Sequence, residues 1–153
     1  MATYDTPVYS WDSPAGFPLN FVYLPVKYTV GGTAIGTSDN IRVCKLPKGA
    51  QLIPAFISVF ADADPDSANN LTVKLEVTDG TTTKTVISTT NFQAIDTRIT
   101  PSAADVTGLG FFKTSSDDFY LKFTPVVGDL DAAAVIFFEI GYSMSPSRDA
   151  STT

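Results

Sequence analysis

The residues of this chain whose spacing most resembles a known chemical motif are three aspartates. Asp62, Asp64 and Asp66 have the i, i+2, i+4 spacing that opens a calcium-binding loop. In such a loop the sixth residue is Gly and the twelfth is Glu, whereas Ser67 and Val73 stand at these positions here. We therefore expect an acidic surface loop, with a weak surface cation site on the three aspartates as the alternative.

Few other residues could carry out catalysis. The chain has no histidine, which excludes Ser-His-Asp and Cys-His nucleophilic systems and the usual zinc ligands. Cys44 is the single cysteine, and we expect it to be a small buried hydrophobic residue within a strand. Glu76 falls on the polar face of a predicted strand. Glu139 interrupts an apolar strand, where we expect it to pair with Arg42 or Lys45, to protrude at a sheet edge or to line a subunit interface. The sequence thus predicts a protein that is not an enzyme and that uses no cofactor or metal.

The elements that would position these residues are predicted to be strands. The stretch Asp39–Phe60 is interpreted as a hairpin of two strands, Asn40–Leu46 and Gln51–Phe60, joined at Pro47-Lys48-Gly49-Ala50. Proline fixes φ at such a turn, and glycine supplies the positive φ that a tight reversal needs. Because the second strand is almost wholly apolar, we expect it to be buried on both faces or to lie against a partner chain.

Alternating apolar and polar residues predict further strands. They are Phe21–Val30, Leu71–Thr78, Thr83–Thr89, Leu109–Lys113, Phe119–Val127 and Ala133–Met144. Pro25 should confine the first of them to a sheet edge or a bulge. Asp79-Gly80 predicts a hairpin between the second and the third. The segment Asn91–Thr107 is expected to be a long crossover that contains a short helical turn. About eight strands with such a crossover predict a single all-β, jelly-roll-like antiparallel β-sandwich over residues 21–146. An immunoglobulin-like sandwich is the alternative, disfavoured by the strand count and by the lack of a cysteine pair.

The two ends of the chain are predicted to lie outside this sandwich. Residues 1–20 contain three prolines without a regular hydrophobic period, which predicts an extended N-terminal arm, and residues 147–153 are expected to form a flexible C-terminal tail. Aromatic residues often anchor interfaces. The arm is therefore expected either to bind a neighbour or to fold back on its own domain. Its aromatic residues are Tyr4, Tyr9, Trp11 and Phe17.

Charge and hydropathy narrow the classes of partner. The net charge is −6, the sequence pI is about 4.3, and the ten Lys and Arg residues are scattered. This composition disfavours direct binding to nucleic acid and suits a solvated exterior surface. No apolar run approaches the roughly 20 residues of a membrane helix. The N-terminus lacks the basic region and apolar core of a signal peptide, so we expect the chain to stay in the cytoplasm of the cell that makes it.

Four segments follow one another in a recognisable order. They are Leu46-Pro47-Lys48-Gly49-Ala50 at the end of a strand, the apolar strand Leu52–Phe60, the alternating Leu71–Thr78, and a closing strand that contains Ile140-Gly141-Tyr142. This order resembles the small virion proteins of tailed bacteriophages, which include the capsid decoration, or cement, proteins, and the resemblance covers roughly Phe21–Pro146. The family commonly has a Leu-Gly after the apolar strand, where this chain has Asp62-Ala63-Asp64-Pro65.

This resemblance implies a virion protein that sits on the outer surface of an icosahedral head, often as a trimer, and stabilises it against the pressure of packaged DNA. The major capsid protein and further copies of the chain would be its partners, with the four aromatic residues of the arm as anchors. An alternative is the receptor- or carbohydrate-binding head of a phage fibre, which would use the loop Asp62–Asn70 with Tyr120 or Tyr142. A head–tail joining or tail component is a third possibility.

Overall fold

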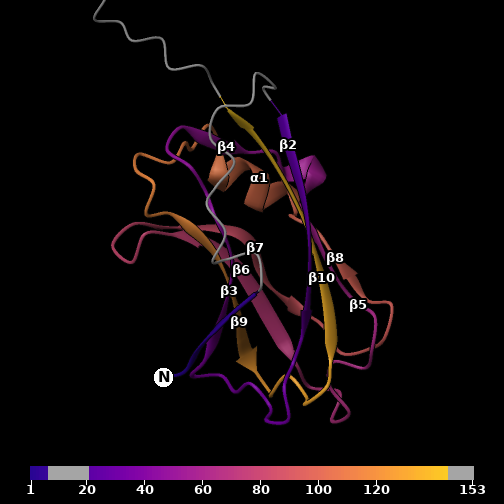
Figure 1. The fold of residues 1–153 in the computed structure, drawn as a ribbon. Helices are drawn as coiled ribbons and strands as arrows, with labels where there is room; N and C mark the ends of the chain where they lie inside the picture. The colour runs from indigo at the N-terminus through magenta and orange to yellow at the C-terminus, as the bar shows by residue number, and fades with distance from the viewer. Residues whose placement is uncertain (7–20, 145–153) are drawn as a thin grey trace, which may run out of the picture.

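Two β-sheets packed face to face form the molecule (Figure 1). This computed structural model describes residues 1–6 and 21–144. One sheet has the strand order β1-β3-β9-β6-β7, and the other has the order β2-β10-β5-β8, with β4 also paired to β10. In chain order the elements are β1 (Thr3–Asp5), β2 (Phe21–Thr29), β3 (Asn40–Lys45), β4 (Ala50–Leu52), the 3-10 helix η1 (Pro54–Phe56), β5 (Ser58–Ala61), β6 (Thr72–Thr78), β7 (Thr83–Asn91), β8 (Arg98–Ile99), α1 (Ala103–Leu109), β9 (Tyr120–Val127) and β10 (Val135–Met144).

Eight of these strands have the nested pairing of a jelly roll. When β1 and β4 are set aside, the first strand pairs with the last, the second with the second-last, and so on inward: β2 with β10, β3 with β9, β5 with β8, and β6 with β7. All four pairs are antiparallel. This arrangement confirms the predicted all-β sandwich of about eight strands.

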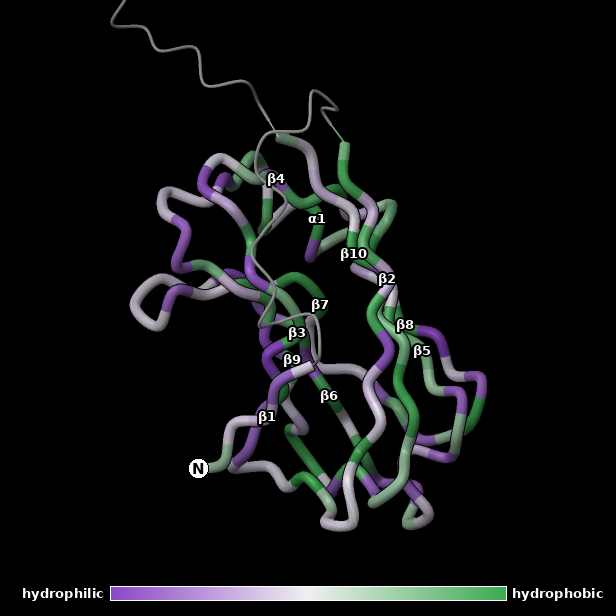
Figure 2. Tube along the Cα trace, viewed as in Figure 1, coloured by the Kyte–Doolittle hydropathy of each residue, from purple (hydrophilic) through white to green (hydrophobic). Residues whose placement is uncertain are grey.

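The core lies between the sheets because the strands alternate inward apolar and outward polar residues. On β6 the side chains of Val73, Leu75 and Val77 are fully buried. The rings of Phe123 on β9 and Phe138 on β10 meet edge to face across the sandwich, with centroids 5.3 Å apart. Each such buried side chain contributes about 1.5–3 kcal/mol. Figure 2 shows hydrophobic residues along the strands and mostly hydrophilic residues in the outlying loops.

The predicted hairpin within Asp39–Phe60 is wrong, because its two strands lie in different sheets. β3 pairs with β1 and β9, whereas β4 pairs with β10. The intervening turn therefore carries the chain from one sheet to the other. Gly49 does have the positive φ expected of it, +85°, and its N–H donates to Thr114 O at 2.9 Å. Turn residues specify a change of direction, but the partner of each flanking strand depends on the rest of the chain.

Two further segments differ from the expectation. The apolar run Gln51–Phe60 is divided into β4, η1 and β5, because Pro54 begins a 3-10 turn instead of continuing a strand. The predicted strand Leu109–Lys113 is instead the end of α1 and the turn after it. The helix begins at a capping box, in which the side chains of Ser102 and Asp105 each accept a hydrogen bond from the other's backbone N–H.

Other expectations hold. The crossover between β7 and β9 contains the short helix α1, as predicted for Asn91–Thr107. β2, which carries Pro25, is an edge strand of its sheet. Cys44 is buried within β3. No helix among the described residues is long and apolar enough to span a membrane.

Candidate functional site

The outer face of the β1-β3-β9-β6-β7 sheet is polar. Glu76 on β6 lies between two lysines, with Lys74 Nζ at 2.9 Å and Lys122 Nζ at 3.4 Å from its carboxylate oxygens. At the β1 edge of the sheet, the guanidinium of Arg42 donates two hydrogen bonds to Asp5, at 2.6 and 2.8 Å. Partly exposed ion pairs of this kind contribute about 0–1 kcal/mol each. This face has the character of a solvated surface.

The outer face of the other sheet is rich in aromatic residues, and we call it the aromatic face. It consists of Phe21, Tyr23 and Lys27 on β2, Phe56 on η1, Ser58 and Phe60 on β5, Arg98 on β8, and Phe137 and Glu139 on β10. The side chains of Phe21, Tyr23 and Phe56 are 40–52% exposed. Phenylalanine, tyrosine and arginine are enriched in protein interfaces, so this face is a candidate binding surface.

One row of the aromatic face crosses four strands in register. Lys27 pairs with Phe137, Phe137 with Phe60, and Phe60 with Arg98. The two rings stack at 5.0 Å between centroids, with Arg98 4.9 Å from the Phe60 ring centre and Lys27 Nζ 5.5 Å from that of Phe137. Cross-strand neighbours of this kind stabilise a sheet, and a cation over a ring adds about 0.5–1 kcal/mol at an exposed site. The row is therefore a pair of stacked rings flanked by a cationic side chain at each end, of which Arg98 is paired with Glu139.

Glu139 lies in the next row. Its carboxylate accepts hydrogen bonds from Ser58 Oγ at 2.7 Å and from Arg98 Nη1 at 2.9 Å. These contacts, the Ser58 hydrogen bond first, hold the pKa of Glu139 below its usual value although partial burial opposes them. A carboxylate held ionised in this way is a poor proton donor. The expected pairing of Glu139 with Arg42 or Lys45 is wrong, because those two residues lie on β3 in the other sheet.

Two adjacent hollows flank η1. One is lined by Tyr23, Ala55, Phe56, Ile57, Ser58, Arg98, Thr100 and Glu139, and thus opens on the aromatic face. The other is lined by Ile53, Pro54, Ala55, Thr100, Pro101 and Val106, and none of these six described residues is charged. Ala55 and Thr100 border both hollows.

Gly141 determines how closely η1 approaches β10. An added Cβ at this position would lie 2.5 Å from Phe56 Cβ, so only glycine leaves room for η1 here. The N–H of Ile53 donates to Gly141 O at 2.9 Å and fixes the start of the turn. Phe56 then meets Phe21 edge to face, with ring centroids 5.2 Å apart.

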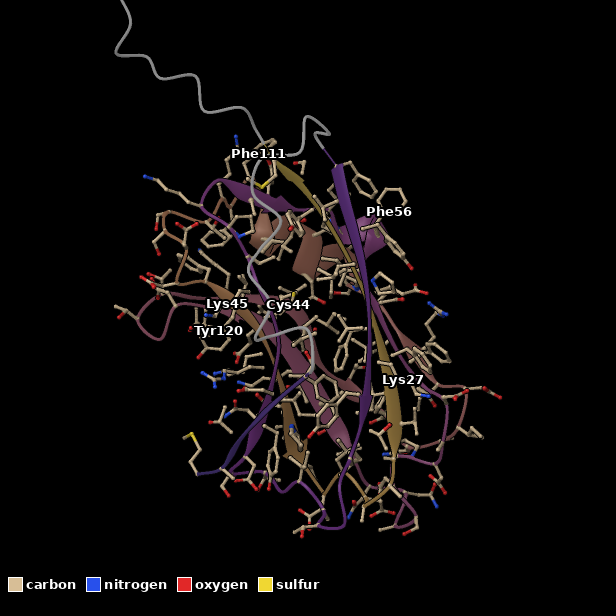
Figure 3. All side chains as sticks on the ribbon, in the orientation of Figure 1. Lys27, Cys44, Lys45, Phe56, Phe111 and Tyr120 are labelled. Atoms are coloured by element: carbon tan, nitrogen blue, oxygen red, sulfur yellow. The ribbon has the colours of Figure 1, made fainter. Side chains whose placement is uncertain are left out.

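Phe111 is a second exposed aromatic feature, away from the aromatic face. Its side chain is 93% exposed, whereas the ring of the next residue, Phe112, packs against Phe119 at 5.5 Å. Figure 3 shows Phe111 at the same end of the sandwich as Phe56.

Of the four aromatic residues predicted as anchors, only Tyr4 is among the described residues. It is half-buried in β1, which pairs in parallel with β3 of its own domain, and it packs against the core. The hydroxyl of Thr6 donates to Val43 O and extends this attachment. Tyr9, Trp11 and Phe17 lie outside the described residues, as does the tail 147–153.

The acidic loop has a structural role. The carboxylate of Asp66 is 1% exposed and accepts hydrogen bonds from the backbone N–H groups of Ala68, Asn70 and Leu71, at 3.0, 2.5 and 2.5 Å. Residues 1–6 and 21–144 contain no group of three or more His, Cys, Asp or Glu side chains that could hold a metal ion. The Asp66 carboxylate instead holds the backbone of its own loop.

The residues proposed for a carbohydrate site are also placed differently. Tyr142 is fully buried in the core, and burial raises the pKa of its phenol to about 12. It cannot line a surface site. Tyr120 is half-buried on β9, in the polar sheet. Sequence reasoning missed the aromatic face because its members come from four strands and a turn; the aromatic residues at alternate positions of β2, Phe21 and Tyr23, were the available signal.

Comparison with known proteins gives structural matches only. No family model and no curated protein matches the sequence. A chain in the capsid of Ralstonia phage GP4 is similar with a TM-score of 0.71 and 12% identity, over 95% of this chain and 99% of that one. A chain of the acid-stable capsid of Helicobacter pylori bacteriophage KHP30 is similar with a TM-score of 0.53 and 13% identity, over 81% of this chain and 87% of that one. A chain of the cyanophage Pam1 capsid is similar with a TM-score of 0.51 and 18% identity, over 91% of this chain and 95% of that one. At these identities the likeness shows a shared fold.

Proposed function

We propose that this protein is a structural component of a bacteriophage virion, and specifically a decoration, or cement, protein that binds the outer surface of the head and stabilises it. The observation that carries the proposal is the match to a chain of the GP4 capsid over 95% of one chain and 99% of the other. A match of that extent involves the whole domain of both chains. Two further phage capsid chains share the fold.

The charge of the protein supports a place on the outside of the head. A surface that faces packaged DNA gains from Lys and Arg side chains that neutralise phosphates, whereas this chain carries a net charge of −6. An acidic, solvated exterior favours solubility at high copy number. The polar outer face of the β1-β3-β9-β6-β7 sheet is suited to face solvent.

Two surfaces are proposed to make contacts with the major capsid protein and with further copies in a trimer. The first is the N-terminal arm, with Tyr4, Tyr9, Trp11 and Phe17 as capsid- and subunit-binding residues. The second is the aromatic face. Each contact can be weak, because copies held on one lattice bind with a high effective concentration.

The test is to add the purified protein to heads from a phage that lacks its gene. We expect co-sedimentation with the heads up to a saturating copy number, and DNA release at a higher temperature than from bare heads. Tyr23→Ser should weaken binding through the aromatic face, and Trp11→Ser should weaken it through the arm while leaving β1 in place. Lys84→Ser, on the exposed surface of β7, is the matched control and should bind as the wild type does.

The position in the virion is tested separately by labelling the protein on intact particles. Label distributed over the head supports the proposal, and label confined to the tail overturns the placement on the head. Unchanged binding of both the Tyr23 and the Trp11 variants would overturn the proposed contact surfaces. Wild-type virions that lack the chain would overturn the structural role itself.

A further inference from the structure

Phe111 is held in an exposed position by the turn that ends α1. The N–H of Gly110 donates to Val106 O at 3.0 Å, with Gly110 at φ +53°, and the N–H of Phe112 donates to Leu109 O at 3.1 Å. Phe112 then turns inward against Phe119. Because the residues on both sides are fixed, the ring of Phe111 projects from the surface with 93% of its area exposed. Burial of an apolar ring that is held in water in this way lowers the free energy of the system.

The chain also carries a hollow suited to such a ring. The uncharged hollow beside η1 is lined by Ile53, Pro54 and Ala55, by Thr100 and Pro101 ahead of α1, and by Val106 within α1. Among the six described residues that line it, every side chain is apolar apart from the hydroxyl of Thr100. Small or rigid residues such as alanine and proline leave room for a planar group and lose little conformational freedom when it binds.

The ring and the hollow belong to one end of the molecule but do not meet within one copy. Val106 lines the hollow from α1, whereas Phe111 follows the C-terminal end of that helix. The 93% exposure of Phe111 shows that it fills no hollow of its own chain. At that end, backbone hydrogen bonds join Thr114, three residues after Phe111, to Gly49 and Ala50, just before η1.

We propose that Phe111 of one copy of this chain inserts into the hollow beside η1 of a second copy. In this arrangement the Phe111 side chain of each copy enters the hollow of the next copy, head to tail. A set of such copies forms a closed oligomer if the rotation between neighbours allows it. No carboxylate lies among the six lining residues or between Val106 and Phe112. Copies with a net charge of −6 repel one another, so they approach most easily at such an acid-free surface.

This inference specifies the subunit contact of the oligomer in the proposed function, yet it is tested in solution without heads. The matched cysteine pair is Gly108→Cys, three residues before Phe111, with Ala55→Cys in one chain; both positions are exposed, and Phe111 itself is kept. Cys44 is buried and leaves little background, since burial raises the pKa of its thiol to about 12. We expect mild oxidation to produce a ladder of disulfide-linked copies that a reductant collapses to monomer. The control pair, Gly108→Cys with Thr85→Cys on β7, also keeps Phe111 and should cross-link far more slowly.

A second measurement uses variants without cysteine. Phe111→Ser removes the ring, and Ala55→Trp fills the hollow from an exposed position, so neither change disturbs the core. Each should weaken self-association by at least about tenfold in analytical ultracentrifugation, as loss of a central interface residue does. The two changes together should weaken it no further than either alone, because both remove the same contact.

Equal cross-linking of the test and control pairs would overturn this contact. A disulfide within one chain only, or wild-type self-association in both substituted variants, would overturn it as well. A wild-type protein that stays monomeric at its highest soluble concentration and forms no cross-linked ladder also overturns it. Specific cross-linking by a protein that does not bind heads would leave the contact in place and overturn the cement role. Head binding without specific cross-linking would overturn the contact and leave the cement role in place.

Discussion

Replacement of Gly141 by alanine tests how η1 is held against the β2-β10-β5-β8 sheet. The added methyl group would lie 2.5 Å from Phe56 Cβ, 3.3 Å from Phe56 O and 3.4 Å from the ring of Phe21. Phe56 cannot simply retreat, because its N–H donates to Ile53 O and the N–H of Ile53 donates to Gly141 O, both at 2.9 Å. Overpacking of this kind costs about 1–3 kcal/mol. Alanine recovers about 0.5–1 kcal/mol because it is better than glycine within a strand.

The expected net loss is therefore about 1–2 kcal/mol in the free energy of unfolding, from the difference of these two effects. For a domain of this size that loss corresponds to a decrease in Tm of roughly 2–8 °C. Urea denaturation followed by circular dichroism measures the free energy directly. Gly32→Ala is the matched control, because an added Cβ there meets no atom within 4 Å. Its effect should stay within about 0.5 kcal/mol.

A double-mutant cycle identifies the cause of the loss. Phe56→Gly removes the Cβ that the new methyl group would meet, so Gly141→Ala should cost at least about 1 kcal/mol less in that background. If Gly141→Ala and Gly32→Ala cost the same, or if the cost of Gly141→Ala is the same with and without Phe56, the reasoning about close approach is refuted.

Two further predictions concern the carboxylates. Asp66→Ala leaves three backbone N–H groups without their acceptor, so the free energy of unfolding should fall by about 2–4 kcal/mol in urea denaturation. The exposed Asp62→Ala is the control and should change little, and a similar effect of both would contradict the role of Asp66. Folding lowers the pKa of Glu139, chiefly through the hydrogen bond from Ser58. It also lowers the pKa of Asp105, where burial is the largest single effect and raises the pKa, but the hydrogen bonds from Ser102 and Ser88 together outweigh it. Both therefore stabilise the fold above their unfolded pKa values of about 4, and this stability is lost as the pH falls through their lower folded values. Glu139→Gln should flatten the fall in Tm below about pH 4, and an unchanged slope would contradict the pKa argument.

Local patterns in the sequence were enough to predict the class of fold. The alternation in Leu71–Thr78 places every second side chain on one face of a strand, and this depends only on backbone geometry. Pro25 lacks an N–H group, which confines it to an edge or a bulge wherever the strand pairs. The capping box of Ser102 and Asp105 is equally local and predicts a helix start.

The composition of the aromatic face could not be predicted, because it depends on contacts between distant parts of the chain. Glu139 pairs with Arg98 because β5 lies between β10 and β8, and no local pattern states that order. The row from Lys27 to Arg98 likewise needs the register of four strands.

The segment Asp39–Phe60 shows where the two kinds of information divide. Its turn at Gly49 and its apolar residues were evident from the sequence, because a positive φ and burial are properties of single residues and their neighbours. Its division between two sheets was decided only by the tertiary structure. A strand takes the partner that buries its apolar face best, and for β3 and β4 those partners, β9 and β10, come from the last third of the chain.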